Sequence, residues 1–349
     1  MKMKKHIRCG LVGLGRISAR HIEAITHHRH DMELVAVCDT NETALQALPE
    51  HHHAKRFPDL KHMLRDTEMD VLSICTPSGL HSSHGILAAE AGCHVVVEKP
   101  MATSWQDGVR LNDTCCAKGV KLFVVLQNRY NPTIMALKKA IDQGRFGQIY
   151  MITSNVFWTR PQSYYDQAAW RGTWSLDGGA FMNQASHYVD MLCWLGGSVD
   201  TVQAFTATLA RNIEVEDTGV MNLRYSSGAL ASLNVTMLAY PHNREGSITV
   251  LGEKGFVRIG GTAMNTIETW EFADTHPEDA EITAASYNAN SVYGNGHKDF
   301  YADIIKSIRN DSALEIDGIE GLKSLELLAA IYDSVDRKNA VQLPLRRYV

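Results

Sequence analysis

Short hydrophobic runs alternate with amphipathic segments over residues 1–126. We expect strands at 7–12, 34–38, 71–75, 94–98 and 121–125. Between them the pattern predicts helices at 16–28, 41–48, 59–66, 80–91 and 104–118. Strands that are hydrophobic throughout are typical of a parallel sheet covered by helices on both faces. Because ligands of such sheets bind at the carboxyl ends of the strands, the residues after each run are the first candidates for a site.

The pattern changes beyond about residue 146, where consecutive β-like segments replace the alternation. After a predicted helix at 132–143, these segments cover 149–157, 199–210, 215–225, 229–238, 246–251, 255–259 and 266–272. Helices at 298–309 and 319–337 follow. Strands joined by short turns indicate an open, mostly antiparallel sheet. We therefore predict an α/β protein with a doubly wound domain over 1–126 and an α+β domain over 127–349. Its terminal helices are free to pack back on the first domain.

Length, charge, and cysteine and histidine content limit the classes of protein and of ligand that the sequence supports. A chain of 349 residues with 45% hydrophobic content is long enough for two cores. A net charge of −5 gives no support for nucleic-acid binding. The seven cysteines form no C-x-x-C pair, which fits a reducing cytoplasm, and no run is long enough to cross a membrane. Histidine clusters at 27–30 and 51–53 lack supporting carboxylates, so we expect no metal site.

A glycine-rich turn follows the first predicted strand. Gly13 and Gly15 lie where the chain must turn sharply and let a pyrophosphate approach the backbone. Arg16 and Ile17 continue the turn, and Ser18 replaces the usual third glycine. Amide groups at the start of the next helix would face the negative charge. The segment predicts a dinucleotide-binding Rossmann domain.

Asp39 supports this reading and indicates which cofactor binds. It ends the second hydrophobic run, roughly twenty residues beyond Gly15, where a carboxylate accepts hydrogen bonds from the adenosine ribose. The same carboxylate would repel a ribose phosphate, and Thr40 and Asn41 offer no cation to bind one. The sequence therefore favours NAD over NADP.

Two further motifs resemble those of the Gfo/Idh/MocA oxidoreductases. Glu98-Lys99-Pro100 follows a parallel strand, and Gly178-Gly179 leads through Asn183 to His187 and Asp190. The resemblance covers essentially the whole chain. It implies that Lys99 lies near the nicotinamide and the reacting carbinol. One departure is Asn183, where the family commonly has an aspartate.

Four other segments resemble the WlbA-type branch of that family. They are 128–132, 157–166, 170–174 and 182–187. That branch oxidises the 3-hydroxyl of UDP-N-acetylglucosaminuronate with NAD, in the synthesis of diacetamido-uronic acids for surface polysaccharide (lipopolysaccharide O-antigen). Asn183 is ordinary within it. The resemblance also implies a homotetramer. Some relatives reoxidise bound NADH with 2-oxoglutarate and others release it.

Oxidation of a secondary alcohol needs a base for the hydroxyl proton and an oriented hydride acceptor. Lys99 and His187 are the catalytic candidates. On a helix, Asn183 and His187 would share one face, four residues apart. Our hypothesis is that Asn183 positions the sugar, His187 takes the proton and Lys99 holds the oxygen. Lys99 is the alternative base, because oxidised nicotinamide would depress its pKa.

The remaining candidates are assigned by ligand. For substrate we expect contacts from Lys99, Arg160, Gln162, Tyr164, Tyr165, Asn183 and His187. For the cofactor, besides the glycine turn and Asp39, we expect Thr76, Pro77, His81, Glu98, Lys99, Asn128, Trp170 and Arg171. Arginine forks suit the diphosphate and carboxylate of a sugar nucleotide. An aromatic lid or a subunit contact would use the same 158–174 loop.

Two rival functions remain open. A dehydrogenase of a free sugar or inositol would share the hydride chemistry but needs fewer arginines. A sensor that binds NAD and a sugar without turnover has no need of a proton acceptor. Lys99 and His187 therefore argue against the sensor.

Overall fold

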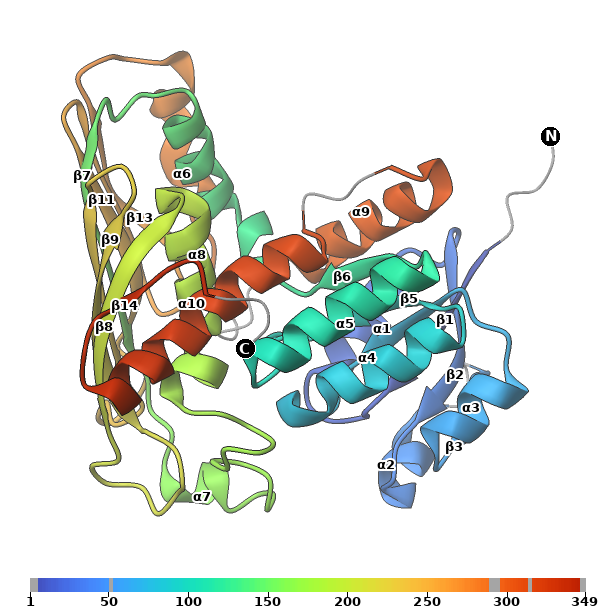
Figure 1. Cartoon of the computed structure of the whole chain (residues 1–349). Coiled ribbons are helices and arrows are strands. Elements are labelled where there is room, and N and C mark those ends of the chain that lie inside the picture. Colours follow the sequence, from blue (N-terminus) through green and yellow to red (C-terminus); the bar gives the residue numbers. More distant parts are fainter. Residues whose placement is uncertain (1–5, 50–52, 289–295, 313–315, 346–349) are drawn as a thin grey trace. The chain divides into compact units, whose positions relative to one another are not determined.

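The computed structural model describes residues 6–49, 53–288, 296–312 and 316–345, which form two compact units (Figure 1). Unit 1 comprises 1–126 and 297–325, and unit 2 comprises 127–296 and 326–349. The segment 297–325 thus groups with the first domain, while helix α10 (Gly318–Arg337) contributes to both units. Residues 51 and 52 of the second histidine cluster lie outside the described residues.

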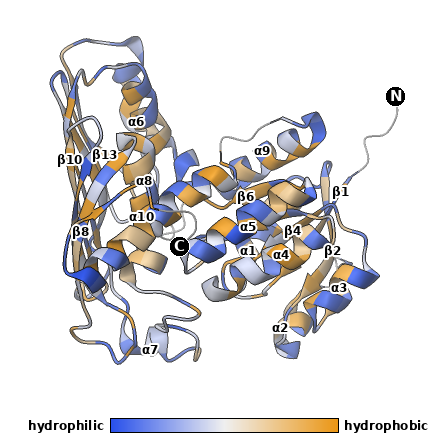
Figure 2. Cartoon of the chain, in the orientation of Figure 1, coloured by the Kyte–Doolittle hydropathy of each residue, from blue (hydrophilic) through white to orange (hydrophobic). Residues whose placement is uncertain are grey.

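Unit 1 contains a six-stranded parallel sheet in the order β3-β2-β1-β4-β5-β6. The strands are β1 (Ile7–Val12), β2 (Met32–Cys38), β3 (Lys55–Phe57), β4 (Val71–Ile74), β5 (His94–Val97) and β6 (Leu122–Val124). The predicted parallel sheet is confirmed, and its central strands are strongly hydrophobic (Figure 2). Strand β3 was not predicted, because its three residues are mostly exposed and show no hydrophobic run.

Helices cover both faces of this sheet (Figure 1). They are α1 (Ser18–His27), α2 (Glu42–Ala47), α3 (Leu60–Asp66), α4 (His81–Glu90), α5 (Trp105–Lys118) and α9 (His297–Asn310). Helix α4 packs against α3 and α5, and α1 packs against α9. Side chains at the helix starts explain several boundaries: Asn41, Asp59 and Ser104 each accept a backbone N–H of the first turn.

Unit 2 is built on an eight-stranded sheet in the order β13-β12-β11-β7-β10-β9-β8-β14. Its strands are β7 (Ile149–Phe157), β8 (Val199–Ala207), β9 (Thr218–Tyr225), β10 (Leu230–Thr236), β11 (Glu245–Gly252), β12 (Gly255–Gly260), β13 (Thr266–Phe272) and β14 (Val341–Gln342). Every neighbouring pair is antiparallel except β7 and β10, which confirms the predicted mostly antiparallel sheet.

Helices of unit 2 lie along one face of this sheet (Figure 1). They include α6 (Pro132–Asp142) and α8 (Ser186–Gly196), while the short α7 (Gln162–Tyr165) lies in the loop after β7. Side chains on the other face alternate with the buried ones, and Phe205 and Val220 pair there across β8 and β9. They are 66% and 42% exposed, so this face presents hydrophobic groups to solvent.

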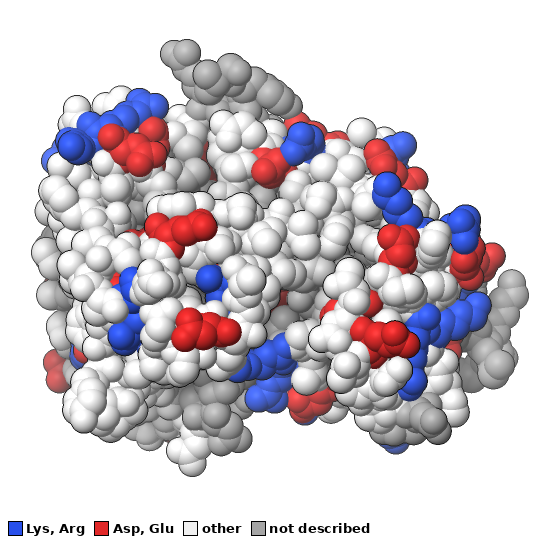
Figure 3. Space-filling view, turned by 90° about the horizontal axis from the view of Figure 1, so that it is seen from below, with Lys and Arg blue, Asp and Glu red and all other residues white. Residues whose placement is uncertain are grey.

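The surface carries charges of both signs. On the side shown in Figure 3, lysine and arginine are interspersed with aspartate and glutamate. Within the described part of the chain, no helix has both the length and the apolar character needed to span a bilayer.

Candidate functional site

The glycine turn between β1 and α1 is open on one side. Gly13 has φ +90°, and a Cβ there would lie 2.7 Å from the backbone that follows β4, so the position requires glycine. A Cβ on Gly15 would meet nothing within 4 Å. Ser18 is buried and donates a 2.6 Å hydrogen bond to the carbonyl of Gly15. Arg16 is exposed and Ile17 is half-buried. The open backbone at the start of a ten-residue helix fits a bound pyrophosphate.

Asp39 follows β2 beside this turn. Its carboxylate accepts hydrogen bonds from the backbone N–H groups of Leu14 (2.6 Å) and Asn41 (2.8 Å). Because a carboxylate has about four acceptor positions, these two bonds orient Asp39 and leave acceptors for ribose hydroxyls. The residues of unit 1 therefore fit the adenosine half of NAD.

His81 connects the loop after β4 with the Glu-Lys-Pro motif. Its Nδ1 lies 2.7 Å from the carbonyl of Pro100, and its Nε2 lies 2.8 Å from the carbonyl of Thr76. The ring is 2% exposed, and burial lowers its pKa. Both ring nitrogens are thus engaged with the chain itself. His81 therefore connects the loop after β4 to Pro100, and its expected contact with the cofactor stays a prediction.

Glu98 is the buried member of the Glu-Lys-Pro motif. Its Oε1 lies 3.0 Å from Nε2 of His21 on α1 and 3.8 Å from Nε2 of His297 on α9. Its Oε2 accepts the backbone N–H of Lys99 at 3.1 Å. Burial alone would raise the pKa of Glu98, but the two histidines more than offset it and hold the pKa well below its usual range. Lys99 itself is half-buried.

The three side chains of His21, Glu98 and His297 also lie close enough for a metal ion, with their ligand atoms within 4.8 Å of one another. These are not the histidines of the two sequence clusters. Hydrogen bonds hold His21 in place, because its other nitrogen is 2.8 Å from the hydroxyl of Tyr301, whereas Nε2 of His297 makes none.

In unit 2, two contacts join α8 to the segment that follows β6. His187, in the first turn of α8, has its Nε2 3.1 Å from the side-chain nitrogen of Gln127. Arg129 donates to Asp190 from Nε (2.9 Å) and Nη2 (2.6 Å). All four side chains are at most 5% exposed. The imidazole of His187 is therefore held in a fixed orientation.

Asn183 and His187 do not lie on one continuous α-helix, which corrects the expected shared face. Asn183 belongs to a π-helical turn (Ala180–Gln184), and α8 begins after Ala185. The amide of Asn183 donates to Asp177, and its carbonyl accepts from the side chain of Gln184 at 3.2 Å.

Gln184 connects Asn183 to the predicted substrate loop. Its Oε1 accepts from Nε of Arg160 at 2.9 Å, and its Nε2 donates to the hydroxyl of Tyr164 at 3.2 Å. The guanidinium of Arg171 donates to the same hydroxyl at 2.6 Å and lies over the rings of Tyr164 and Trp170. Residues that we assigned separately to cofactor and substrate thus form one polar cluster.

Three other candidates in unit 2 lie outside this set of hydrogen bonds. Gln162 accepts the backbone N–H of Asn212 and donates to Asp166. Tyr165 is 7% exposed, its ring contacts that of Tyr164, and burial raises its pKa. Asn128 is 2% exposed, in the turn that carries Gln127. The substrate contacts expected of Gln162 and Tyr165 stay predictions.

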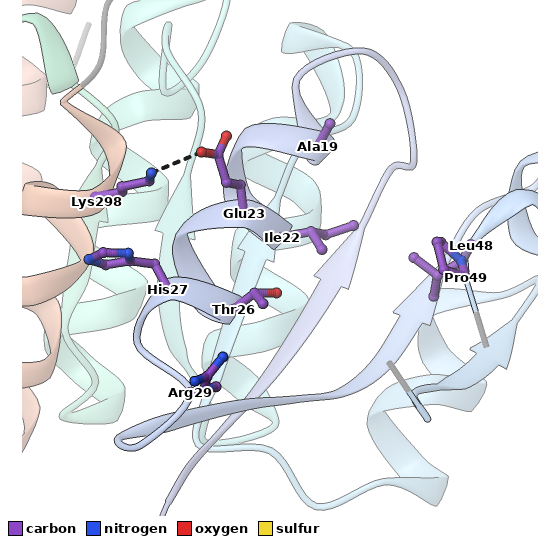
Figure 4. A pocket seen from close by; sticks show the side chains of 9 residues that line it. All are labelled: Ala19, Ile22, Glu23, Thr26, His27, Arg29, Leu48, Pro49 and Lys298. Atoms are coloured by element: carbon purple, nitrogen blue, oxygen red, sulfur yellow. Dashed lines mark ion pairs between the residues drawn. The ribbon is translucent and has the colours of Figure 1, made fainter. Parts of the chain in front are cut away.

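A surface hollow of about 560 Å³ lies beside α1 in unit 1 (Figure 4). Its lining includes the ion pair between Glu23 and Lys298, 3.0 Å apart. None of the predicted site residues lines it.

Sequence reasoning assigned no role to Gln184 or to the histidines around Glu98. Gln127 follows a predicted strand together with Asn128, and that position marks both as candidates, although only Asn128 was given a ligand. Gln184 lies in the 182–187 segment of the family resemblance, whereas nothing local distinguishes His21.

Comparisons with known proteins agree with this geometry. Residues 7–126 match the oxidoreductase family's NAD-binding Rossmann fold (GFO_IDH_MocA), and residues 138–343 match its C-terminal alpha/beta domain. The chain belongs to this family and is an NAD-dependent oxidoreductase.

Several relatives cover nearly the whole chain. The WlbA dehydrogenase from Bordetella pertussis, solved with NADH and UDP-GlcNAcA, is 56% identical over 99% of both chains, with a TM-score of 0.93. The WlbA dehydrogenase from Chromobacterium violaceum, solved with the same ligands, is 53% identical over 98% of this chain and 97% of that one, with a TM-score of 0.94. Myo-inositol 2-dehydrogenase from Thermotoga maritima is 26% identical over 97% of this chain and 98% of its own.

Proposed function

We propose that this protein oxidises the 3-hydroxyl of UDP-N-acetylglucosaminuronate to the 3-keto sugar with NAD. The observation that carries the proposal is the polar cluster of Arg160, Tyr164, Arg171, Asn183 and Gln184. Two guanidinium groups held by aromatic rings and amides suit the anionic groups of a sugar nucleotide. The likeness to dehydrogenases solved with UDP-GlcNAcA supports it.

In this proposal Arg160 and Asn183 contact the sugar nucleotide. Arg171, Trp170 and Asn128 contact the cofactor, as do Thr76, Pro77 and Glu98 around the nicotinamide half. NAD supplies the hydride acceptor. His187 takes the hydroxyl proton, and Lys99 holds the hydroxyl oxygen. An amide N–H of Gln127 donated to Nε2 places the proton of the neutral imidazole on Nδ1, so in this proposal His187 takes the hydroxyl proton at Nε2 in exchange for its contact with Gln127.

We extend the proposal to the protein's setting. The product would serve the synthesis of diacetamido-uronic acids for lipopolysaccharide O-antigen, and 2-oxoglutarate would reoxidise bound NADH. The hydrophobic groups on the open face of the unit 2 sheet, such as Phe205 and Val220, support assembly into a homotetramer. Free cysteines, most of them buried, fit a reducing cytoplasm.

A substrate panel tests the proposal. UDP-N-acetylglucosaminuronate, UDP-N-acetylglucosamine, UDP-glucuronate and myo-inositol are each offered with NAD, and NADH formation is followed with and without 2-oxoglutarate. We expect turnover of the first compound to exceed that of UDP-N-acetylglucosamine by at least about tenfold, because the neutral sugar lacks one charge-assisted hydrogen bond. UDP-glucuronate keeps the carboxylate but lacks the N-acetyl group, and we expect it and myo-inositol to be turned over more slowly than the first compound as well. Preference for UDP-N-acetylglucosamine would refute the uronate assignment.

The second candidate is a dehydrogenase of a free cyclitol or sugar, favoured by the full-length likeness to a myo-inositol 2-dehydrogenase. Turnover of myo-inositol alone in the same panel would establish it. A protein that binds NAD but reduces it with no compound would instead be a sensor.

A further inference from the structure

A carboxylate is buried inside unit 1, at the residue that directly precedes the catalytic candidate Lys99. Glu98 is 5% exposed, at the end of β5. Its two oxygens face His21, His297 and the backbone N–H of Lys99. The hydrogen bonds from His21 and from the backbone N–H of Lys99 orient the carboxylate and favour its ionised form, while His297 approaches it without a hydrogen bond.

The hydrogen-bonded chain behind Glu98 can be completed without a positive charge. His21 donates from Nε2 to Glu98, which leaves Nδ1 to accept from the hydroxyl of Tyr301 at 2.8 Å. The hydroxyl of Ser73 is 2.7 Å from that of Tyr301 and donates to it. His21 and Tyr301 then each make two hydrogen bonds, and none of the three groups needs a positive charge to make them. Burial lowers the pKa of His297, which favours its neutral form. The carboxylate of Glu98 is then the charged group of the cluster.

Strand order places this charge on the nicotinamide side of the sheet. In the order β3-β2-β1-β4-β5-β6, Asp39 follows β2 and the glycine turn follows β1. A dinucleotide with its adenosine ribose at β2 and its pyrophosphate at β1 extends across the switch point toward β4 and β5. Glu98 lies at the carboxyl end of β5, where the nicotinamide ring is expected.

We propose that the buried Glu98 carboxylate is a fixed negative charge that favours binding of oxidised NAD over NADH. The nicotinamide ring is cationic in NAD and neutral in NADH, so a nearby anion stabilises only the oxidised form. His21 and His297 are positioning residues, because they act by holding the carboxylate. The proposal requires only that unit 1 binds NAD, and it is independent of which sugar the enzyme oxidises.

The test is the ratio of the dissociation constants for NAD and NADH, measured by calorimetry on the full-length protein without substrate. Glu98→Gln keeps the shape of the side chain and removes its charge. We expect NAD binding to weaken at least about tenfold more than NADH binding, since a neighbouring opposite charge typically changes the equilibrium of a charged group by one to three factors of ten. Equal weakening of both ligands would mean that Glu98 has only a structural role, and would overturn the proposal.

Tyr301→Phe is the matched control. It breaks the same buried hydrogen-bonded chain and removes no charge, so the ratio should stay within about twofold of the parent while the melting temperature falls. A tenfold change in the ratio for Tyr301→Phe would show that disorder alone produces the effect, and would contradict the charge argument.

A second variant keeps the proposal testable if Glu98→Gln does not fold. His297→Lys places a cation near the carboxylate, which Nε2 of His297 approaches to 3.8 Å, and should move the ratio in the same direction. An unchanged ratio would oppose the proposal. Metal analysis of the purified protein is an independent check. One zinc ion per chain that is lost in His297→Gln would put a cation at Glu98 and overturn the proposal.

Discussion

The contact between Gln127 and His187 offers a way to identify the catalytic base. Gln127→Glu would place a carboxylate about where the amide now lies, 3.1 Å from Nε2 of His187. At that distance Coulomb's law gives about 5 kcal/mol of attraction for an imidazolium at an effective dielectric constant of about 20. Burial of the new carboxylate offsets part of this. We therefore expect the pKa of His187 to rise by about one to three units.

The sign of the effect on activity follows from the role of a base. His187 accepts a proton only when it is neutral, so a higher pKa moves the acidic limb of the pH profile to higher pH. Below that limb, kcat/KM of Gln127→Glu should fall about tenfold for each unit of displacement, equivalent to about 1.4 kcal/mol per unit. The assay is kcat/KM against pH, with NAD and the best sugar of the substrate panel.

Gln127→Met is the matched control for this experiment. It removes the amide and adds no charge, so its activity should fall without displacement of the limb. Retained NAD binding shows that each variant is folded. If the acidic limb of Gln127→Glu coincides with that of the parent, His187 is not the titrating base, and Lys99 takes that role.

Four further substitutions test the remaining assignments. Asp39→Ala should weaken NAD binding and relax discrimination against NADP, because it removes both a ribose acceptor and a repulsive charge. If the unsubstituted protein already prefers NADP, the assignment of Asp39 to the adenosine ribose is wrong. Lys99→Met and His187→Asn should each lower kcat by about 10²–10⁴ with NAD binding largely retained, and a loss of only a few-fold would exclude that residue from proton transfer. Arg160→Ala should weaken binding of the uronate by about 1.5–3 kcal/mol, roughly ten- to a hundredfold, and spare its neutral 6-hydroxymethyl analogue. Equal losses on both sugars would assign Arg160 to the diphosphate or to the loop that Gln184 holds.

Local patterns were sufficient to predict most of the fold. The central strands of unit 1 are mostly hydrophobic, unlike the short edge strand β3, and β1 begins and ends at the predicted residues. Consecutive β-like segments joined by short turns predicted the large sheet of unit 2. They gave no sign that β7 and β10 run parallel. That pairing depends on the order in which strands assemble, which no local pattern encodes. The π-helical turn before α8 also escaped prediction, because its sequence continues an apolar helical pattern.

The residues of the candidate site likewise divide into those that local sequence predicts and those that depend on tertiary packing. Gly13 and Asp39 were predictable because the backbone turn and the strand end fix their roles locally. Gln127 and His187 are 60 residues apart, and His21 and Glu98 are 77 apart. Partners at such separations are brought together only by tertiary packing, so their types alone gave no reason to pair them.

The buried histidines contact the residues on either side of Lys99 and so fix the backbone from which its flexible side chain extends. Lys99 lies between Glu98, which His21 and His297 orient, and Pro100, whose carbonyl faces His81. These rings come from α1, α9 and α4, three helices that are separate in sequence. Burying polar groups costs stability unless each is hydrogen-bonded, and hydrophobic side chains of similar size would fill the same space at lower cost. Polar groups at these positions are therefore better explained by the orientation of the Glu98–Pro100 backbone than by stability, because a hydrophobic core would leave that backbone without directional contacts.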